Sequence, residues 1–98
     1  MSVHPLNPAA APPHEDVVAA LSRYVADAFL DGDAASLTPD SPLLEWGVLT
    51  SMNTAQLLTH VRERFGVDVP PQAITATHLR DLNAISALVR GLMAARAT

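Results

Sequence analysis

Residues 47–66 read GVLTSMNTAQLLTHVRERFG, and this stretch decides the fold. A loop that contains a glycine ends at Thr50, and the apolar spacing that follows predicts an amphipathic helix over residues 51–65. Gly66 closes that helix, because glycine readily adopts the left-handed conformation that ends many helices. Ser51 therefore stands at a helix N-terminus with its hydroxyl exposed. The inward stripe is expected to comprise Ala55, Leu58, Val61 and Phe65, with Met52 and Leu57 beside it.

Two more stretches show helical periodicity, with apolar residues recurring at steps of three and four. The first predicts a helix over residues 15–30, with an apolar face of Val17, Val18, Leu21, Val25, Ala28 and Phe29. The last helix is expected to start near Leu79, with a cap near Thr77 or His78, and to bury Leu82, Ile85, Leu88, Val89, Leu92 and Met93. Residues 72–78 can hold one short helical turn. The sequence thus predicts an all-α fold, a small four-helix bundle of three long helices and one short helix.

The composition fits one small domain. The chain has 98 residues, no cysteine, and few aromatic residues among its 49% hydrophobic residues, which favours packed helices over a sheet. Residues 1–14 contain four prolines and no apolar periodicity, so they are expected to form a disordered N-terminal tail. The domain itself is predicted to span residues 15–96.

The charge balance excludes some classes of partner. A net charge of −4 disfavours nucleic acid and suits docking onto enzymes that carry basic patches. There is no pattern of a secretory signal and no run of eighteen apolar residues, so the sequence predicts a cytoplasmic protein without a membrane span. No long apolar seam remains beyond the core, which predicts a monomer.

The connection over residues 31–50 is long and carries its own apolar residues. Leu37, Leu43, Leu44, Trp46 and Leu49 are expected to pack it onto the bundle. Trp46 is interpreted as a core anchor of this loop. A partly exposed docking aromatic stays open as the alternative, since tryptophan is enriched at binding hot spots.

Over residues 15–95 the order of these features resembles that of the acyl and peptidyl carrier proteins. The attachment signature of that family, Gly-x-x-Asp-Ser-Leu or Met, stands here as residues 47–52, and Phe65-Gly66-Val67-Asp68-Val69-Pro70 is similar to its segment after the second helix. The most specific stretch runs from Leu43 to Pro70. Three features look nearest to free-standing peptidyl or D-alanyl carriers. They are the Leu-x-Ser-Met form, the following Gln56-Leu57-Leu58 and the lack of a strongly acidic second helix.

The resemblance implies that Ser51 receives 4′-phosphopantetheine from coenzyme A and carries an acyl or aminoacyl group as a thioester. It implies no catalysis by the domain itself, because a phosphopantetheinyl transferase supplies the metal and the base. The other implied partners are a loading enzyme, either adenylating or an acyltransferase, and a downstream acceptor synthase or transferase in polyketide or nonribosomal peptide type specialised metabolism. The residues expected to dock these partners are Leu49, Thr50, Met52 and Arg62.

One position departs from the family pattern, since Thr50 stands where the residue before the serine is usually aspartate. This change leaves an alternative open: a helical protein-interaction module, a degenerate carrier that is not phosphopantetheinylated. Ser51 is also a good N-cap residue, a role compatible with attachment.

The histidines and the acidic loop residues suggest no metal site. His60 is expected to be solvated, because Arg64 stands where a second ligand would lie one turn later, and His4 and His14 fall in the tail. Asp31, Asp33, Asp40 and Glu45 lack the alternating spacing of a calcium loop. The absence of a Gly-x-Ser-x-Gly elbow likewise argues against a serine hydrolase.

Overall fold

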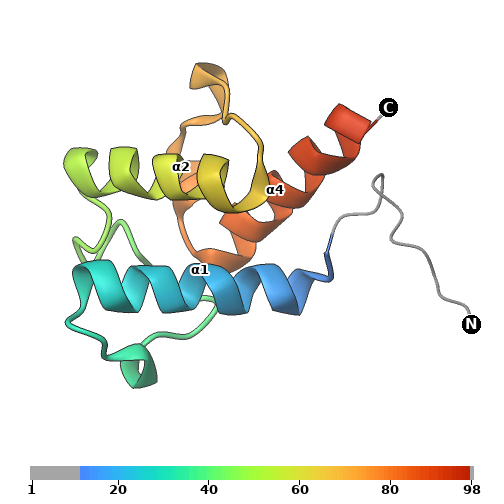
Figure 1. Cartoon of the computed structure of the whole chain (residues 1–98). Coiled ribbons are helices and arrows are strands. Elements are labelled where there is room, and N and C mark those ends of the chain that lie inside the picture. Colours follow the sequence, from blue (N-terminus) through green and yellow to red (C-terminus); the bar gives the residue numbers. More distant parts are fainter. Residues whose placement is uncertain (1–11, 98) are drawn as a thin grey trace, which may run out of the picture.

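The computed structural model describes residues 12–97 and is helical, with no strand among these residues. Three long helices and one short helix confirm the predicted all-α bundle (Figure 1). They are α1 (His14–Phe29), α2 (Ser51–Phe65), α3 (Ala76–Leu79) and α4 (Leu82–Ala97), with the 3₁₀ turns η1 (Ala34–Ser36) and η2 (Pro71–Ala73) between them. The last long helix starts at Leu82, later than predicted. The residue before it is Asp81, which accepts a hydrogen bond from the backbone N–H of Ala84 at 2.8 Å. The predicted cap residues, Thr77 and His78, belong to α3 instead.

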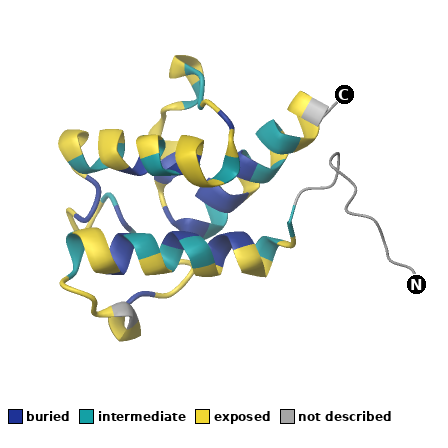
Figure 2. Cartoon of the chain, viewed as in Figure 1, coloured by how far each residue is buried: buried dark blue, intermediate teal, exposed yellow. Residues whose placement is uncertain are grey.

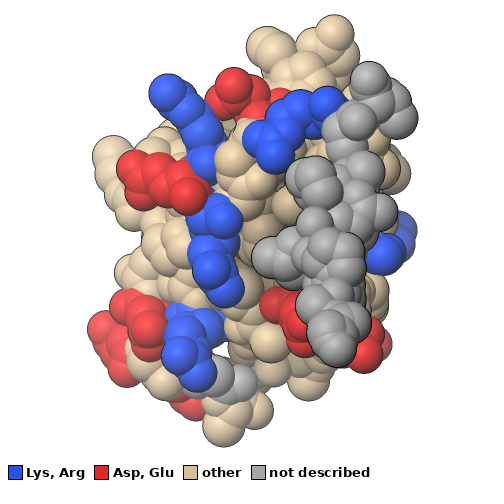
Figure 3. All heavy atoms as spheres, turned by 45° about the vertical axis from the view of Figure 1, so that its right-hand side comes forward, with Lys and Arg blue, Asp and Glu red and all other residues tan. Residues whose placement is uncertain are grey.

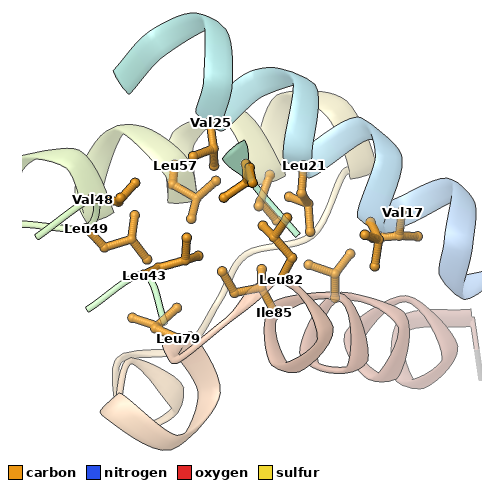
Figure 4. Packing of buried hydrophobic residues seen from close by; sticks show 14 of the residues in the cluster. Val17, Leu21, Val25, Leu43, Val48, Leu49, Leu57, Leu79, Leu82 and Ile85 are labelled. Atoms are coloured by element: carbon orange, nitrogen blue, oxygen red, sulfur yellow. The ribbon is translucent and has the colours of Figure 1, made fainter. Parts of the chain in front are cut away.

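One hydrophobic core joins the helices to the long loop. α1 packs mainly against α4, and α2 runs antiparallel to α1 (Figure 1). Figure 4 shows side chains from every long helix and from the loop converging between the ribbons. Its fully buried members are Val17, Leu21, Val25, Leu43, Leu57, Val61, Leu82, Ile85 and Val89. Burying each such side chain is worth roughly 1.5–3 kcal/mol, so this core is the main source of stability.

The start of α1 is pinned to α4 by polar contacts. His14 is hydrogen-bonded through Nδ1 to Ser86 Oγ at 2.8 Å and through Nε2 to Asn83 Oδ1 at 2.9 Å. Arg90 donates from Nε to the Pro12 carbonyl at 2.9 Å. The expectation that His14 belongs to a loose tail is therefore wrong, because His14 is the first residue of α1 and bonds to the fully buried Ser86. The tail prediction for residues 1–11 falls outside the described residues.

The loop over residues 31–50 is fixed at two points to the junction between α3 and α4. The backbone N–H of Leu43 donates to the Arg80 carbonyl at 2.9 Å, and that of Asn83 donates to the Pro39 carbonyl at 3.1 Å. Figure 2 shows buried positions within this loop between exposed ones. The loop therefore holds a defined position when it reaches α2.

The buried face of α2 is rotated from the predicted stripe. Leu57 and Val61 are buried, Leu58 and Phe65 are half-buried, and Ala55 is exposed. Met52, expected beside the stripe, is 71% exposed. The rotation places Leu57 in the core and leaves the residues around Ser51 on the surface.

Candidate functional site

Ser51 is the first residue of α2, and its neighbour Thr50 caps that helix. Thr50 Oγ1 accepts a hydrogen bond from the backbone N–H of Asn53 at 3.1 Å. The Asn53 side chain in turn donates from Nδ2 to the Val48 carbonyl at 2.8 Å. The junction between loop and helix is thus fixed from both sides. The N-cap role that Ser51 could have filled belongs to Thr50.

The Ser51 hydroxyl is left free by this arrangement. The residue is exposed, and its side chain makes no hydrogen bond within residues 12–97. Threonine and aspartate are both favoured N-cap residues, so Thr50 caps α2 without bringing a negative charge beside Ser51.

The start of α2 suits an anionic substituent. The first turn of this 15-residue helix has no acidic residue, and its basic residues, Arg62 and Arg64, lie in the last turn. Backbone N–H groups without helical partners and the positive end of the helix dipole stabilise an anion there by about 0.3–1 kcal/mol when exposed. A phosphodiester on Ser51 therefore fits the residues present.

The four residues predicted to dock partners lie in different environments. Met52 is exposed beside Ser51, whereas Leu49 is only 4% exposed and belongs to the core. This burial corrects the prediction for Leu49, which holds the loop in place and offers no surface to a partner. Thr50 is exposed, but its hydroxyl is engaged in the cap. Arg62 lies towards the other end of α2 and pairs with Asp68 at 3.5 Å, with both side chains largely exposed.

Trp46 departs from its expected place. It is 59% exposed and is not part of the hydrophobic core, so the interpretation as a core anchor is wrong. Leu43, Val48 and Leu49 anchor the loop instead. A fixed loop with three buried anchors turns the intervening tryptophan outward.

A groove with a volume of about 760 Å³ lies between α1 and α2, and His60 is part of its lining. The His60 ring stacks on Tyr24, with centroids 4.0 Å apart and planes at 9°. Burial, followed by the nearby positive charge of Arg64, lowers the pKa of His60 below its usual value, with Glu63 opposing. His60 Nε2 is buried and has no hydrogen-bond partner among residues 12–97. The expectation of a solvated His60 is therefore wrong, and sequence spacing gave no sign of the stacking partner on another helix.

The described part of the chain offers neither a metal-binding cluster nor a membrane-spanning helix. Residues 12–97 contain no group of three or more His, Cys, Asp or Glu side chains placed to hold a metal ion. Within the same residues, no helix has the length and apolar character needed to cross a bilayer.

Comparison with known proteins identifies the family. The family model described as phosphopantetheine attachment site matches residues 18–89. Among solved structures, a chain from a crystal structure described as that of an FAD-dependent dehydrogenase is 32% identical, with a TM-score of 0.67, over 70% of this chain and 97% of that chain. Among curated proteins no match is found. The chain therefore belongs to the phosphopantetheine-binding carrier family, whose prosthetic group is 4′-phosphopantetheine.

Proposed function

We propose that this protein is a free-standing carrier that holds a biosynthetic intermediate as a thioester on 4′-phosphopantetheine attached to Ser51. The observation that carries the proposal is the exposed Ser51 hydroxyl at the first position of α2, which has no hydrogen-bond partner in the described part of the chain and lies within the matched family region. Because Thr50 already caps the helix, modification of Ser51 costs no hydrogen bond of the fold.

The attachment step needs only a positioned hydroxyl from this chain. Ser51 Oγ forms a bond to the β-phosphorus of coenzyme A, and the bond from that phosphorus to adenosine 3′,5′-bisphosphate breaks. The hydroxyl proton passes to a base of the phosphopantetheinyl transferase. The protein is thus a substrate of its partners and not a catalyst. The bound group supplies a thiol to a chain that has no cysteine.

Intact-protein mass tests this assignment directly. The parent, Ser51→Ala and Ser36→Ala are each incubated with coenzyme A, magnesium and a general-purpose phosphopantetheinyl transferase. Ser36 is an exposed serine of the preceding connection and serves as a matched control. We expect a gain of one phosphopantetheinyl group in the parent and in Ser36→Ala, and none in Ser51→Ala, whose circular dichroism should stay unchanged. Loading of Ser51→Ala would contradict the site, and a folded parent without any gain would favour an unmodified interaction module.

The proposed pathway rests on the Leu-x-Ser-Met form and on the charge of α2. α2 lacks the strongly acidic face common in fatty-acid carriers, since its charged residues are Arg62, Glu63 and Arg64, and the Leu-x-Ser-Met form resembles peptidyl and D-alanyl carriers. We place the carrier in specialised metabolism of the polyketide or nonribosomal peptide type, in the cytoplasm. Its partners there are a loading enzyme, adenylating or an acyltransferase, and an acceptor synthase or transferase.

A second candidate concerns the reaction performed on the carried group. The similar chain belongs to a crystal structure described as that of an FAD-dependent dehydrogenase, and the match spans nearly all of that chain. We propose a flavin-dependent dehydrogenase as one partner, which removes a proton from the carbon next to the thioester carbonyl and a hydride from the next carbon. The FAD of the partner takes the hydride and becomes reduced. The test mixes the loaded carrier with a flavin-dependent dehydrogenase in the absence of oxygen and follows the absorbance of the oxidised flavin in a single turnover. Loss of this absorbance would support the proposal, and no loss with any loaded form of the carrier would contradict it.

A further inference from the structure

The arginines of this chain fall into two groups. All six basic residues are arginines, and four of them bond to carboxylates or backbone carbonyls: Arg62, Arg80, Arg90 and Arg96. The other two, Arg23 and Arg64, make no hydrogen bond and no ion pair within residues 12–97, although the Arg64 guanidinium lies 5.8 Å from the centre of the Phe65 ring. Both line the groove between α1 and α2. Figure 3 shows basic side chains following one another down one face of the molecule, with acidic side chains beside them.

The two walls of this groove each carry one of these guanidiniums. Arg23 stands on α1 beside Tyr24, and Arg64 stands on α2 one turn after His60. The Tyr24 ring stacks on that of His60 and donates from its hydroxyl to the Gln56 carbonyl at 3.3 Å, which fixes the walls relative to each other. The lining also includes three small side chains of α1, those of Ala19, Ala20 and Ala28. The resulting volume of about 760 Å³ is typical of sites for small molecules.

Two carboxylates also line the groove and limit where an anion can bind. Asp16 precedes Arg23 on α1 by a rise of about 10 Å, and Asp27 follows it by about 6 Å. Neither carboxylate forms an ion pair with Arg23 or Arg64 among the described residues. An anion is therefore favoured next to the two guanidiniums and disfavoured towards either carboxylate.

The groove lies away from the surface around Ser51. His60 follows Ser51 on α2 by about two and a half helical turns, which places the two side chains on opposite sides of the helix. A group attached to Ser51 therefore does not account for the unpaired arginines of the groove.

We propose that the groove between α1 and α2 binds a small dicarboxylate, with one carboxylate on Arg23 and the other on Arg64. Guanidinium and carboxylate groups form charge-assisted, often bidentate hydrogen bonds. Because the two arginines stand on different walls, two anionic groups joined by an apolar chain fit better than one compact anion. The alanines and the Tyr24 ring offer apolar surface to that chain. This inference goes beyond the proposed function and does not depend on modification of Ser51.

Binding of adipate to the unmodified chain tests the inference. Adipate is added at constant ionic strength while the His60 imidazole signals are followed by NMR. Saturation is expected with a Kd of about 1 mM, since exposed ion pairs each contribute little. Burial and the charge of Arg64 lower the pKa of His60, so a carboxylate bound to Arg64 should raise that pKa again. The absence of a saturable change at His60 would overturn the inference.

Matched ligands separate a dicarboxylate site from other sites. Monomethyl adipate has one charge and inorganic phosphate is compact, so each should bind about 5-fold more weakly than adipate. Phosphate binding as tight as that of adipate would indicate a site for any oxyanion. Tighter binding of a blocked peptide with two glutamates would assign the groove to a partner protein. Either of these results would overturn the inference.

Matched variants locate the site on the chain. Arg23→Gln and Arg64→Gln should each weaken adipate binding about 5-fold, and Asp27→Asn should strengthen it by removing a like charge. The control is Arg80→Gln, which alters an exposed arginine between α3 and α4, outside the groove, and should stay within about twofold of the parent. All four side chains are exposed, so circular dichroism should be unchanged. Equal weakening by Arg80→Gln, or parent-like binding by Arg64→Gln, would contradict the proposed site and leave the carrier assignment intact.

Discussion

The two ends of α2 are stabilised in different ways. At the Ser51 end the cap is a neutral threonine, the Ser51 hydroxyl makes no hydrogen bond within residues 12–97, and the first turn has no acidic residue. At the Gly66 end the backbone N–H of Gly66 donates to the Arg62 carbonyl at 2.9 Å, Arg96 donates to the Gly66 carbonyl, and the Arg62 side chain pairs with Asp68. The Ser51 end thus keeps an exposed hydroxyl, whereas the Gly66 end contacts other parts of the chain. Under the proposed function, the terminus that keeps backbone N–H groups without helical partners is the one that carries the modified serine.

The largest expected stability effect lies at the Gly66 end. Gly66 has φ of 73°, and a Cβ there would come within 2.9 Å of Arg96 Nη1. Gly66→Ala should lower the free energy of unfolding by about 1–3 kcal/mol, through backbone strain and loss of the Arg96 hydrogen bond. Urea denaturation measures the change.

Gly47→Ala is the matched control at the Ser51 end. Gly47 has the same φ of 73°, and no atom outside its chain neighbours lies within 4 Å of the place that an added Cβ would take. The substitution should cost only the backbone strain, about 1–2 kcal/mol. An equal loss in both variants would mean that Arg96 adds nothing at the Gly66 end and would weaken the comparison.

A second test removes the cap at the Ser51 end. Thr50→Ala should cost about 1 kcal/mol, because the Asn53 N–H loses its side-chain acceptor. Thr50→Asp keeps an acceptor in that place and should stay within about 0.5 kcal/mol of the parent. The thermal midpoints of the three proteins measure this order. Equal stability of the alanine variant and the parent would show that the cap contributes nothing.

The smallest effect concerns pH and the contact between α2 and α1. The pKa of His60 is lowered in the folded state, so the unfolded chain binds the proton more readily. Stability should therefore be complete above the unfolded value of about 6.5 and should fall as the pH drops below it towards the folded pKa. Arg64 and Glu63 on α2 act on this pKa, and Asp16, Arg23 and Asp27 on α1 line the same groove.

The measurement compares urea midpoints of the parent and His60→Gln at pH 7.5 and pH 5. The variant should lose less stability between the two pH values, because it lacks the titrating ring. His14 and His78 are retained in both proteins and serve as the internal control. An identical loss in parent and variant would contradict a role for His60.

Much of this fold follows from spacing, while the placement of individual side chains does not. The apolar steps from Val17 to Phe29 and from Leu82 to Met93 define helices that the structure contains. Spacing cannot tell which flank of an amphipathic helix meets its neighbours, so α2 is rotated and Leu57 rather than Ala55 is buried. The stack of His60 on Tyr24 and the bond from His14 to Ser86 join residues far apart in the chain. No local pattern encodes such pairs.

The structure confirms that Ser51 is the exposed first residue of α2, whereas several residues around it lie elsewhere than predicted. Ser51 follows from the family signature, and the loop geometry then decides what surrounds it. Leu49 and Trp46 are both apolar loop residues, yet one is buried and the other exposed. Their difference depends on the backbone hydrogen bonds of Leu43, Val48 and Gly47, which composition alone does not reveal.

The exposed position of Trp46 determines what optical spectroscopy can report on this protein. It is the single tryptophan of the chain, so all indole fluorescence originates from the loop that leads to Ser51. Because the ring is already largely in water, unfolding should shift its emission little, whereas burial against another protein should shift it to the blue. The emission wavelength of Trp46 should thus change little on folding and clearly on docking, so docking can be followed without an attached dye.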